Sequence, residues 1–322
     1  MFLKAQPLFF ITQTPLHMGT GTDLGIIDMP IQRERSTSFP KLEASGLKGS
    51  FREVFEKIVK EKNAKKEMQS TQVLEDLFGP APENMKDDND RASALGFTDG
   101  RILFFPVKSV KDVYALVTCR TVLNRFIDDI NMCQETKLPF IQNVSSDKTT
   151  IYSKDSKLLL NSDKIILEEY VFNVEEMNAD EKRVIDFLYN LLSHYYDDKI
   201  LFPKSKLVIL PDDDFRDFVK YSTEVITRTR IDDESGTVTR GGLFTEEYLP
   251  VNTIMYSLVL ATPIFLTKTI KEKSIIGNDE FDEVNNILKF FTDNLPTIIQ
   301  LGGNSTLGKG LVKVATGGII NE

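Results

Sequence analysis

The 322-residue sequence contains little cysteine, and its two cysteines, Cys119 and Cys133, do not form a Cys-x-x-Cys pair. With only two cysteines and no such spacing, neither structural zinc nor a disulfide framework is expected, and a reducing cytosol is the simplest setting. The sequence also lacks an apolar run of the roughly 18 residues that a membrane-spanning helix needs. Its first seven residues lack the charged-then-apolar layout of a signal peptide. We therefore expect a cytoplasmic protein with no membrane partner.

The sequence also has fewer positive than negative charges. It contains 39 Lys and Arg and 48 Asp and Glu, which gives a net charge of −9. This balance argues against a general nucleic-acid coat protein, which would carry excess positive charge. The basic residues are unevenly distributed, however, since residues 30–66 hold ten Lys or Arg against five Glu, a local balance of +5. The chain can therefore form a limited basic surface on an acidic body.

Apolar residues recur with helical and strand-like periods, and together they predict strands interleaved with helices. Ser45 can cap a helix, and the apolar positions that follow it recur every 3.6 residues. Asn178 and Glu181 form a capping box, which predicts a second helix start. Helices are expected over residues 45–59, 122–130, 178–192, 212–221 and 278–291, and strands over 8–14, 101–107, 113–118, 164–171, 206–210, 253–262 and 311–315.

Most of the predicted strands suit antiparallel pairing, so the sequence predicts an α+β fold with helices on one face of an antiparallel sheet. We expect a single domain over residues 1–322. Asp233-Glu234-Ser235-Gly236 is a turn signal between two strand-like segments, residues 221–231 and 237–243, and it predicts a hairpin inside an insertion at residues 212–250. Residues 79–97 combine Gly-Pro-Ala-Pro with an acidic run, which predicts a polar, mobile loop.

Two residues near the N-terminus suit the chemistry of a polyanion. His17 follows the first predicted strand, where an imidazole can bind ribose or phosphate or act as acid or base. A lone histidine is, however, more often structural. Asp28 ends an apolar run, so it can cap a loop, act as a base, or bind a hydrated divalent ion. The residue types alone leave these alternatives open.

Lys48 and Arg52 are four residues apart and share one face of the helix predicted to follow Ser45. Gly49 lies between them and would let a ligand's backbone approach the helix. A solvated helix face is the usual role of such a pair, and a phosphate contact is the alternative.

A glycine-rich segment, residues 301–310, lies between the last predicted helix and the last strand. Gly302 and Gly303 would let backbone N–H groups approach phosphate, and Lys309 adds a positive charge. The segment is not a P-loop, because Gly310 stands where a P-loop has Ser or Thr and because the helix precedes the strand. This argues against a free-standing nucleotide-binding enzyme. An ordinary glycine turn and a phosphate-binding loop both remain open.

The predicted hairpin carries arginine and aromatic side chains, which on a protruding ribbon can stack on bases or wedge between them. A ribbon used for protein contacts is the alternative. The candidate residues are Arg228, Arg230, Arg240, Phe244, Glu246, Glu247 and Tyr248.

These segments occur in an order that resembles the RAMP superfamily of CRISPR proteins, and more narrowly the repeated backbone subunit of the type III-B (Cmr) effector complex. The resemblance runs nearly end to end, and its most specific segment is Asp28-Met29-Pro30-Ile31-Gln32-Arg33-Glu34. Further matching segments are Thr14-Pro15-Leu16-His17, Leu47-Lys48-Gly49, Leu77-Phe78-Gly79, residues 102–107, 122–126 and 209–213, Gly241-Gly242-Leu243 with Glu246-Glu247-Tyr248, and the glycine-rich segment.

The resemblance implies a modified ferredoxin-like (RRM-like) palm with a β-hairpin thumb. It implies that copies of the subunit stack in a filament along a CRISPR guide RNA, together with other subunits of the effector complex. Each thumb would kink the guide–target duplex and flip out a nucleotide. The activity implied is metal-dependent endoribonuclease cleavage of the target single-stranded RNA, in antiviral defence.

On this resemblance the site residues divide between two RNA strands. RNA supplies its own nucleophile, the 2′-hydroxyl, so the protein mainly has to hold the strand in line. The family's loop aspartate aligns with Asp28, as base or as ligand of Mg²⁺ or Mn²⁺, and its loop histidine aligns with His17. Contacts to guide phosphates would fix position without reading sequence, and they are assigned to Lys48, Arg52, Gly302, Gly303, Lys309 and Arg33.

A scaffold that binds guide RNA without cutting is the alternative function. Asp28 favours the endoribonuclease, because a pure scaffold needs no carboxylate beside a phosphate.

Overall fold

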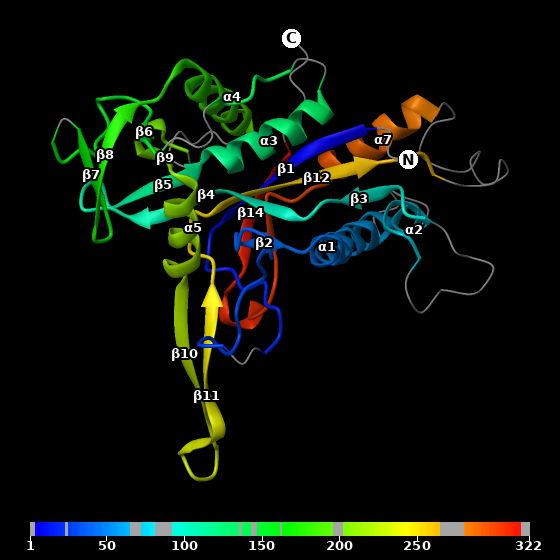
Figure 1. Cartoon of the computed structure of the whole chain (residues 1–322). Helices are drawn as coiled ribbons and strands as arrows, with labels where there is room; N and C mark the ends of the chain where they lie inside the picture. Colours follow the sequence, from blue (N-terminus) through cyan, green and yellow to red (C-terminus); the bar gives the residue numbers. More distant parts are fainter. Residues whose placement is uncertain are drawn as a thin grey trace.

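The structure is a computed structural model that describes residues 4–22, 25–64, 72–80, 92–134, 137–142, 147–161, 163–195, 202–264 and 280–316. Over these residues the chain has a mixed α/β fold built on one large sheet, and a two-stranded hairpin projects from it (Figure 1). No helix in the described part of the chain is long and apolar enough to cross a membrane.

The elements have the following bounds. The strands are β1 (Lys4–Thr12), β2 (Lys41–Leu42), β3 (Leu95–Phe97), β4 (Gly100–Lys108), β5 (Tyr114–Cys119), β6 (Thr149–Ile151), β7 (Lys164–Leu167), β8 (Tyr170–Glu176), β9 (Leu207–Leu210), β10 (Glu224–Ile231), β11 (Val238–Tyr248), β12 (Ile254–Ala261), β13 (Ile298–Gln300) and β14 (Leu311–Thr316). The helices are α1 (Ala44–Ala64), α2 (Gln72–Phe78), α3 (Arg120–Cys133), α4 (Ala179–Tyr195), α5 (Asp212–Tyr221) and α7 (Glu280–Asp293), with the 3-10 turns η2 (Lys204–Lys206) and η3 (Ser305–Leu307).

The large sheet has the strand order β13-β14-β1-β12-β4-β5-β9-β6-β8-β7, while β2 pairs with β4 and β3 pairs with β12. Within it, β14, β1, β12 and β4 are each antiparallel to the neighbouring strand. The chain order β1-α1-β4 is repeated as β12-α7-β14. The centre of the sheet therefore consists of two strand–helix–strand halves whose strands alternate.

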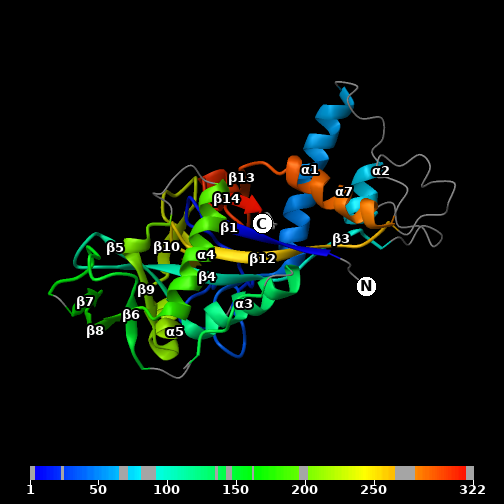
Figure 2. The ribbon, with the colours of Figure 1, turned by 90° about the horizontal axis from the view of Figure 1, so that it is seen from above.

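Helices cover both faces of this sheet. Successive side chains of a strand point to opposite faces, so the partners of Phe9 and Phe10 in β1 show which helix lies on which face. The ring of Phe10 lies 6.3 Å from Phe51 of α1, whereas the ring of Phe9 lies 6.1 Å from Phe126 of α3. Phe291 of α7 also packs on Phe51, and Figure 2 shows α1 and α7 on one side of the strands and α3 on the other. The prediction of helices on one face is confirmed for α1 and α7 and is wrong for α3.

Two strand pairs depart from the predicted antiparallel sheet. β5 runs parallel to β9, and β6 runs parallel to β8. Parallel neighbours need a long crossover connection, and the chain between β5 and β9 supplies one through α3 and α4. The pattern of apolar residues predicts the strands themselves but carries no information on the direction of a distant partner.

Local signals in the sequence are confirmed where short-range contacts decide the structure. In the capping box, the Glu181 N–H donates to Asn178 Oδ1 (2.9 Å) and the Asn178 N–H donates to Glu181 Oε2 (3.0 Å). Residues 164–171, predicted as one strand, instead form β7 and the start of β8. Of the predicted loop at 79–97, residues 81–91 lie outside the described residues, and the end of the loop forms β3.

The predicted hairpin is present and is longer than expected. β10 and β11 pair from Glu224↔Tyr248 to Ile231↔Val238, so β11 continues beyond the predicted end at residue 243. Figure 1 shows the hairpin reaching away from the sheet, with the blue loop after β1 and the red loop before β14 beside its base. These two loops carry the candidate site residues His17, Asp28, Arg33, Gly302, Gly303 and Lys309.

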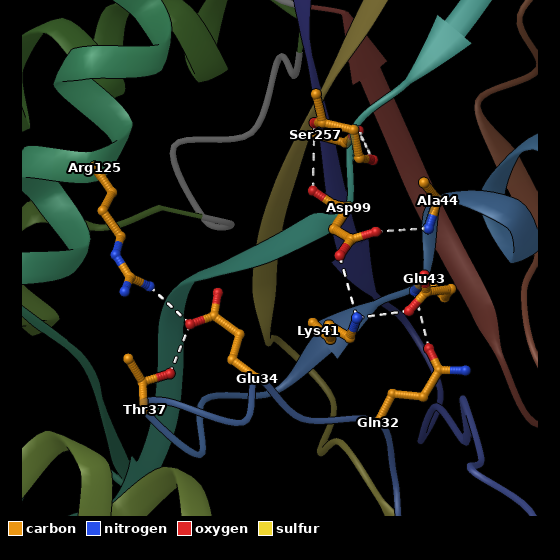
Figure 3. Close-up of polar contacts among 10 residues, drawn as sticks. Gln32, Glu34, Thr37, Lys41, Glu43, Ala44, Asp99, Arg125 and Ser257 are labelled. Carbon is orange, nitrogen blue, oxygen red and sulfur yellow. Dashed lines mark hydrogen bonds and ion pairs between the residues drawn. The ribbon is translucent and has the colours of Figure 1, made fainter.

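The start of α1 is fixed by a side chain from a distant segment (Figure 3). Asp99 Oδ1 accepts a hydrogen bond from the Ala44 N–H (3.0 Å), and Lys41 Nζ lies 2.6 Å from Glu43 Oε2 and 3.2 Å from Asp99 Oδ2. The helix begins at Ala44, so the prediction that Ser45 caps it is wrong. Sequence pattern could not identify Asp99 as the capping group, because it comes from a segment more than 50 residues away.

The loop of residues 28–41 is anchored by two further contacts that Figure 3 shows. Gln32 Oε1 accepts a hydrogen bond from the Glu43 N–H (2.9 Å), and Glu34 Oε2 pairs with Arg125 Nη1 of α3 at 2.8 Å. The loop that begins at Asp28 is therefore held at Gln32 by Glu43, the residue before α1, and at Glu34 by α3.

Candidate functional site

The candidate site is organised by one edge of β11, the edge that β10 does not occupy. Two loop segments bind along it: residue Leu16 pairs with Leu249, and Met29 pairs with Glu246. Backbone hydrogen bonds run from the Met29 N–H to the Thr245 carbonyl (3.0 Å) and from the Glu247 N–H to the Met29 carbonyl (3.0 Å). The segments that carry His17 and Asp28 are thus brought to the same strand edge.

Asp28 is exposed, and its carboxylate is held by a single residue of β11. The Thr245 N–H and Oγ1 both donate to Asp28 Oδ2, at 2.7 and 2.9 Å, and the Asp28 N–H donates to Thr245 Oγ1 at 3.0 Å. These bonds, the backbone one first, lower the pKa of Asp28 below its ordinary value. The carboxylate is therefore charged at neutral pH, and Oδ2 is the oxygen that these bonds occupy.

His17 is 9% exposed and lies inside the site. Its Nδ1 donates to the Glu247 carbonyl (2.7 Å), and its ring packs against Tyr248 with 5.5 Å between centroids. Nε2 faces Gly19 closely, since a Cβ built there would lie 2.4 Å away. This environment suits a residue that positions the loop, and it favours that role over proton transfer.

Glu246 and Tyr248 face the glycine-rich loop, because alternate residues of a strand share a side. The Tyr248 OH donates to Glu246 Oε2 (2.7 Å), Arg228 Nη1 lies 2.6 Å from the same oxygen, and Asn304 Nδ2 donates to Glu246 Oε1 (3.1 Å). Burial raises the pKa of Glu246, but these hydrogen bonds outweigh it and the pKa is lowered. Burial and the bond to Glu246 raise the pKa of Tyr248 to about 12.

Glu247 faces the opposite side, toward the loop of residues 28–33. It is 2% exposed; Oε1 pairs with Arg33 Nη2 at 2.5 Å, and Oε2 accepts from the Ile31 N–H at 3.0 Å. Arg33 Nη1 also donates to the carbonyls of Ser38 and Val219, both at 2.9 Å. Arg33, predicted to contact RNA, thus has its guanidinium directed into the protein, which favours a structural role.

The glycine-rich loop lies against the His17 segment. The Gly303 N–H donates to the His17 carbonyl (2.9 Å), and a Cβ built on Gly302 would lie 2.2 Å from that oxygen. Lys309 Nζ lies 5.1 Å from the centroid of the Tyr248 ring. The loop therefore serves to hold the site together, and Lys309 adds positive charge beside it.

Lys48 and Arg52 lie on α1 and face residues that flank the segment 81–91. Lys48 Nζ donates to Ser93 Oγ (2.7 Å), and Arg52 Nη1 donates to the Gly79 carbonyl (2.8 Å). Burial, and then the nearby Arg52 charge, lower the pKa of Lys48. The first turn of α1 meets the His17 loop, since a Cβ on Gly46 would lie 2.9 Å from Met18 Cε.

The remaining hairpin candidates lie farther along the ribbon. The Phe244 ring is half-buried, with the Arg228 guanidinium carbon 5.7 Å from its centroid. Arg230 is exposed, and its backbone carbonyl accepts from Thr239 Oγ1 (3.2 Å). These two residues are available to a ligand that lies along the hairpin.

The carboxylate that this site exposes to a divalent ion is that of Asp28, because Glu246 and Glu247 are buried and hydrogen-bonded within the protein. Among the described residues, no three His, Cys, Asp or Glu side chains gather in a way that could hold a metal ion. Mg²⁺ commonly binds proteins through one or two carboxylates, with water and phosphate oxygens completing its octahedron. The charged, exposed Asp28 fits this mode, provided that RNA supplies the other ligands.

Two residues of the site, Thr245 and Asn304, and Asp99 at the start of α1 were not singled out from the sequence. Thr245 holds Asp28, Asn304 donates to both Glu246 and the Tyr248 hydroxyl, and Asp99 caps α1. Asn304 had a weak signal, since Asn beside glycine tolerates the left-handed backbone that it adopts (φ 63°). No sequence signal pointed to Thr245 or Asp99, because their hydrogen-bond partners are distant in the sequence.

The family of the protein follows from its sequence over nearly its whole length. The sequence matches the RAMP superfamily over residues 9–313, nearly its whole length. The chain therefore belongs to the RAMP superfamily.

Two individual proteins are similar to the chain over nearly its whole length. The chain is 34% identical to the CRISPR system Cmr endoribonuclease Cmr4 of Pyrococcus furiosus, an alignment that covers 99% of this chain and 98% of the relative. It is 25% identical to the CRISPR system CMR subunit Cmr4 of Saccharolobus solfataricus, over 96% and 95% of the two chains.

Solved structures agree with this assignment. The crystal structure of oligomeric Cmr4 from Pyrococcus furiosus has a TM-score of 0.70 and 29% identity, with 99% of both chains covered. A chain in the cryo-EM structure of the type III-B Cmr-beta complex bound to cognate target RNA has the same fold, with a TM-score of 0.67, 22% identity and 98% of both chains covered.

Proposed function

We propose that this chain is a repeated backbone subunit of a type III-B CRISPR effector complex, which binds guide RNA and cleaves complementary target RNA. Its family, and its 34% identity over nearly the full length to a Cmr endoribonuclease, support the activity. Its likeness to an oligomeric relative supports assembly with copies of itself. The remaining subunits of such a complex, and a cytoplasmic location, are part of the same proposal.

The observation that carries the catalytic role is the geometry of Asp28. A charged carboxylate is exposed at the base of the hairpin, with Oδ2 fixed by Thr245. In the proposed reaction, the RNA 2′-hydroxyl loses its proton to solvent and its oxygen bonds to phosphorus as the bond to the 5′-oxygen breaks. The 5′-oxygen takes up a proton from solvent, so the chain mainly has to hold the two oxygens in line. A lowered pKa makes Asp28 a weak base, which favours a role as an ionic ligand.

When bound, Mg²⁺ or Mn²⁺ would supply positive charge to the phosphate oxygens. Asp28 is the residue that would hold it. His17 keeps the loop in place through the Glu247 carbonyl, and it is proposed as a positioning residue.

The finer architecture belongs to the same proposal. The strand order β14-β1-β12-β4 and the repeated strand–helix–strand order support a modified ferredoxin-like palm, to which α3 on the opposite face is an addition. The projecting β10–β11 hairpin supports a thumb that separates bases, with Phe244 and Arg230 as its contact residues.

Guide RNA is assigned to the basic surface between α1 and the glycine-rich loop. Lys48, Arg52 and Lys309 are proposed to contact phosphates. Gly302 and Gly303 are proposed to act indirectly, because both pack on the His17 carbonyl and so hold the loop that carries Lys309. Arg33 is left out of this group because its guanidinium pairs with the buried Glu247. Such contacts fix the position of the guide without reading its sequence, so base pairing supplies the specificity.

The substitution Asp28→Asn tests the catalytic role in the assembled complex. Because the amide keeps the shape of the carboxylate but loses its charge, we expect target RNA to bind normally and cleavage to fall below detection. Gel analysis of labelled target RNA under single-turnover conditions measures both. Asp155→Asn, at an exposed position outside the site, is the matched control. Cleavage at the wild-type rate in Asp28→Asn would leave the non-cleaving scaffold as the better description.

A further inference from the structure

The hydroxyl of Thr245, a residue of β11, forms hydrogen bonds with a residue of a distant loop. Its Oγ1 accepts from the Asp28 N–H (3.0 Å) and donates to Asp28 Oδ2 (2.9 Å), and the Thr245 N–H donates to the same oxygen (2.7 Å). Three hydrogen bonds thus join two residues that are 217 positions apart in the sequence. They fix both the backbone and the carboxylate of Asp28.

The neighbouring backbone continues this attachment. Met29 pairs with Glu246 in parallel orientation, and the Ile31 N–H donates to Glu247 Oε2 (3.0 Å). Residues 28–31 therefore lie along β11 like a short added strand. Because β11 is also one strand of the projecting hairpin, the carboxylate and the hairpin form one connected unit.

We infer that Thr245 is a positioning residue for Asp28, and that through it the β10–β11 hairpin sets the orientation of the carboxylate. This inference rests on the proposed function of Asp28. With Oδ2 occupied by two donors from Thr245, Oδ1 is the oxygen directed to a ligand. A hairpin displaced by RNA would move Asp28 with it, so the seating of the target strand and the placement of the carboxylate are coupled.

The part of the Thr245 side chain that these contacts require is its hydroxyl. Serine supplies the same hydroxyl, whereas valine has the same shape without it. Valine would leave the Asp28 N–H without its acceptor and remove one of the two donors to Oδ2, while the Thr245 backbone bond would remain. Thr229, an exposed residue of β10 opposite Leu243, offers a matched control on the same hairpin.

The test compares Thr245→Val, Thr245→Ser, Thr229→Val and Asp28→Asn in the assembled complex with guide RNA. At saturating target RNA we expect Thr245→Val to cleave between about 5-fold and 100-fold more slowly, since small displacements of a catalytic group have effects of this size. Its affinity for target RNA should match that of wild type. Thr245→Ser should restore the rate to within about 3-fold of wild type, because a retained hydroxyl can form the same bonds.

A second measurement reports on position without using activity. Amide hydrogen exchange of the peptide that contains residues 25–31 should be faster in Thr245→Val and unchanged in Thr245→Ser and Thr229→Val. A wild-type rate and wild-type exchange in Thr245→Val would overturn the positioning role even where Asp28→Asn is inactive. Equal losses of rate in Thr245→Val and Thr229→Val would overturn it as well. Cleavage by Asp28→Asn would instead contradict the proposed function.

Discussion

Two glycines of the 301–310 loop have the same backbone region but different surroundings. Gly302 has φ 71° and Gly308 has φ 69°, so both occupy the left-handed region that residues with a Cβ avoid. A Cβ on Gly302 would lie 2.2 Å from the His17 carbonyl oxygen, whereas a Cβ on Gly308 would meet nothing within 4 Å. Position 302 therefore requires glycine for two reasons, its left-handed backbone and its contact with the His17 carbonyl, whereas position 308 has only the first.

This difference predicts unequal effects of the same substitution. Gly308→Ala should lower the free energy of unfolding by about 1 kcal/mol, the cost of a left-handed alanine. Gly302→Ala should lower it by more than about 2 kcal/mol, because the contact with the His17 backbone adds to that cost. Urea denaturation of the two variants measures both values. Equal losses would show that the close contact at His17 does not constrain position 302.

The two sides of β11 divide the candidate site between two loops. Glu246 and Tyr248 bind the glycine-rich loop through Asn304, while Thr245 and Glu247 bind the loop that begins at Asp28. The strand period of two residues made this division predictable once β11 was known to be a strand. Which loop lies on which side depends on contacts between segments that are far apart in the sequence.

The buried charge of Glu246 predicts a pH-dependent contribution to stability. Its pKa is lowered in the folded protein, so the contribution is complete above the unfolded pKa, near 4.5, and is lost as the pH falls through the lower folded value. Glu246→Gln should therefore be less stable than wild type by ~2 kcal/mol at pH 7, in line with hydrogen bonds to a charged group, and the gap should narrow below pH ~4.

Denaturant unfolding at pH 7 and pH 3 checks this prediction. Glu169→Gln, at an exposed turn position between β7 and β8, provides the baseline for a surface carboxylate. A gap of the same size at both pH values would mean that Glu246 acts through its shape and not through its charge.

On the scale of the whole molecule, an acidic chain carries a local basic surface. The net charge is −9, and most contacts with RNA phosphates are assigned to α1 and the glycine-rich loop. Phosphate contacts release counterions, so their number is measurable from the salt dependence of binding.

Replacing Lys48 and Arg52 with alanine should weaken binding of guide RNA and flatten its salt dependence. For single-stranded RNA, each phosphate contact contributes about 0.7 to the slope of log K against log salt, so the slope should fall by about 1.4. Filter binding at several salt concentrations measures it. Lys57→Ala with Lys60→Ala removes the same charge from exposed positions of α1 and is the control. An unchanged slope in the Lys48 and Arg52 variant would remove both residues from the RNA surface.

The sequence by itself determined the local elements and the residue types of the site. The helix at 212–221, the capping box at Asn178 and the hairpin turn at 233–236 all depend on contacts within a few residues, which a pattern can reveal. The resemblance to a known family likewise rests on short segments that occur in the same order along the chain.

Only the tertiary structure decided the rest. It placed α3 opposite α1, made two strand pairs parallel, capped α1 with Asp99, directed Arg33 into the protein and attached Asp28 to Thr245. Each of these outcomes joins groups that are distant in the chain. The free energy of such a contact depends on burial and geometry that exist only after folding, so the order of residues alone does not specify it.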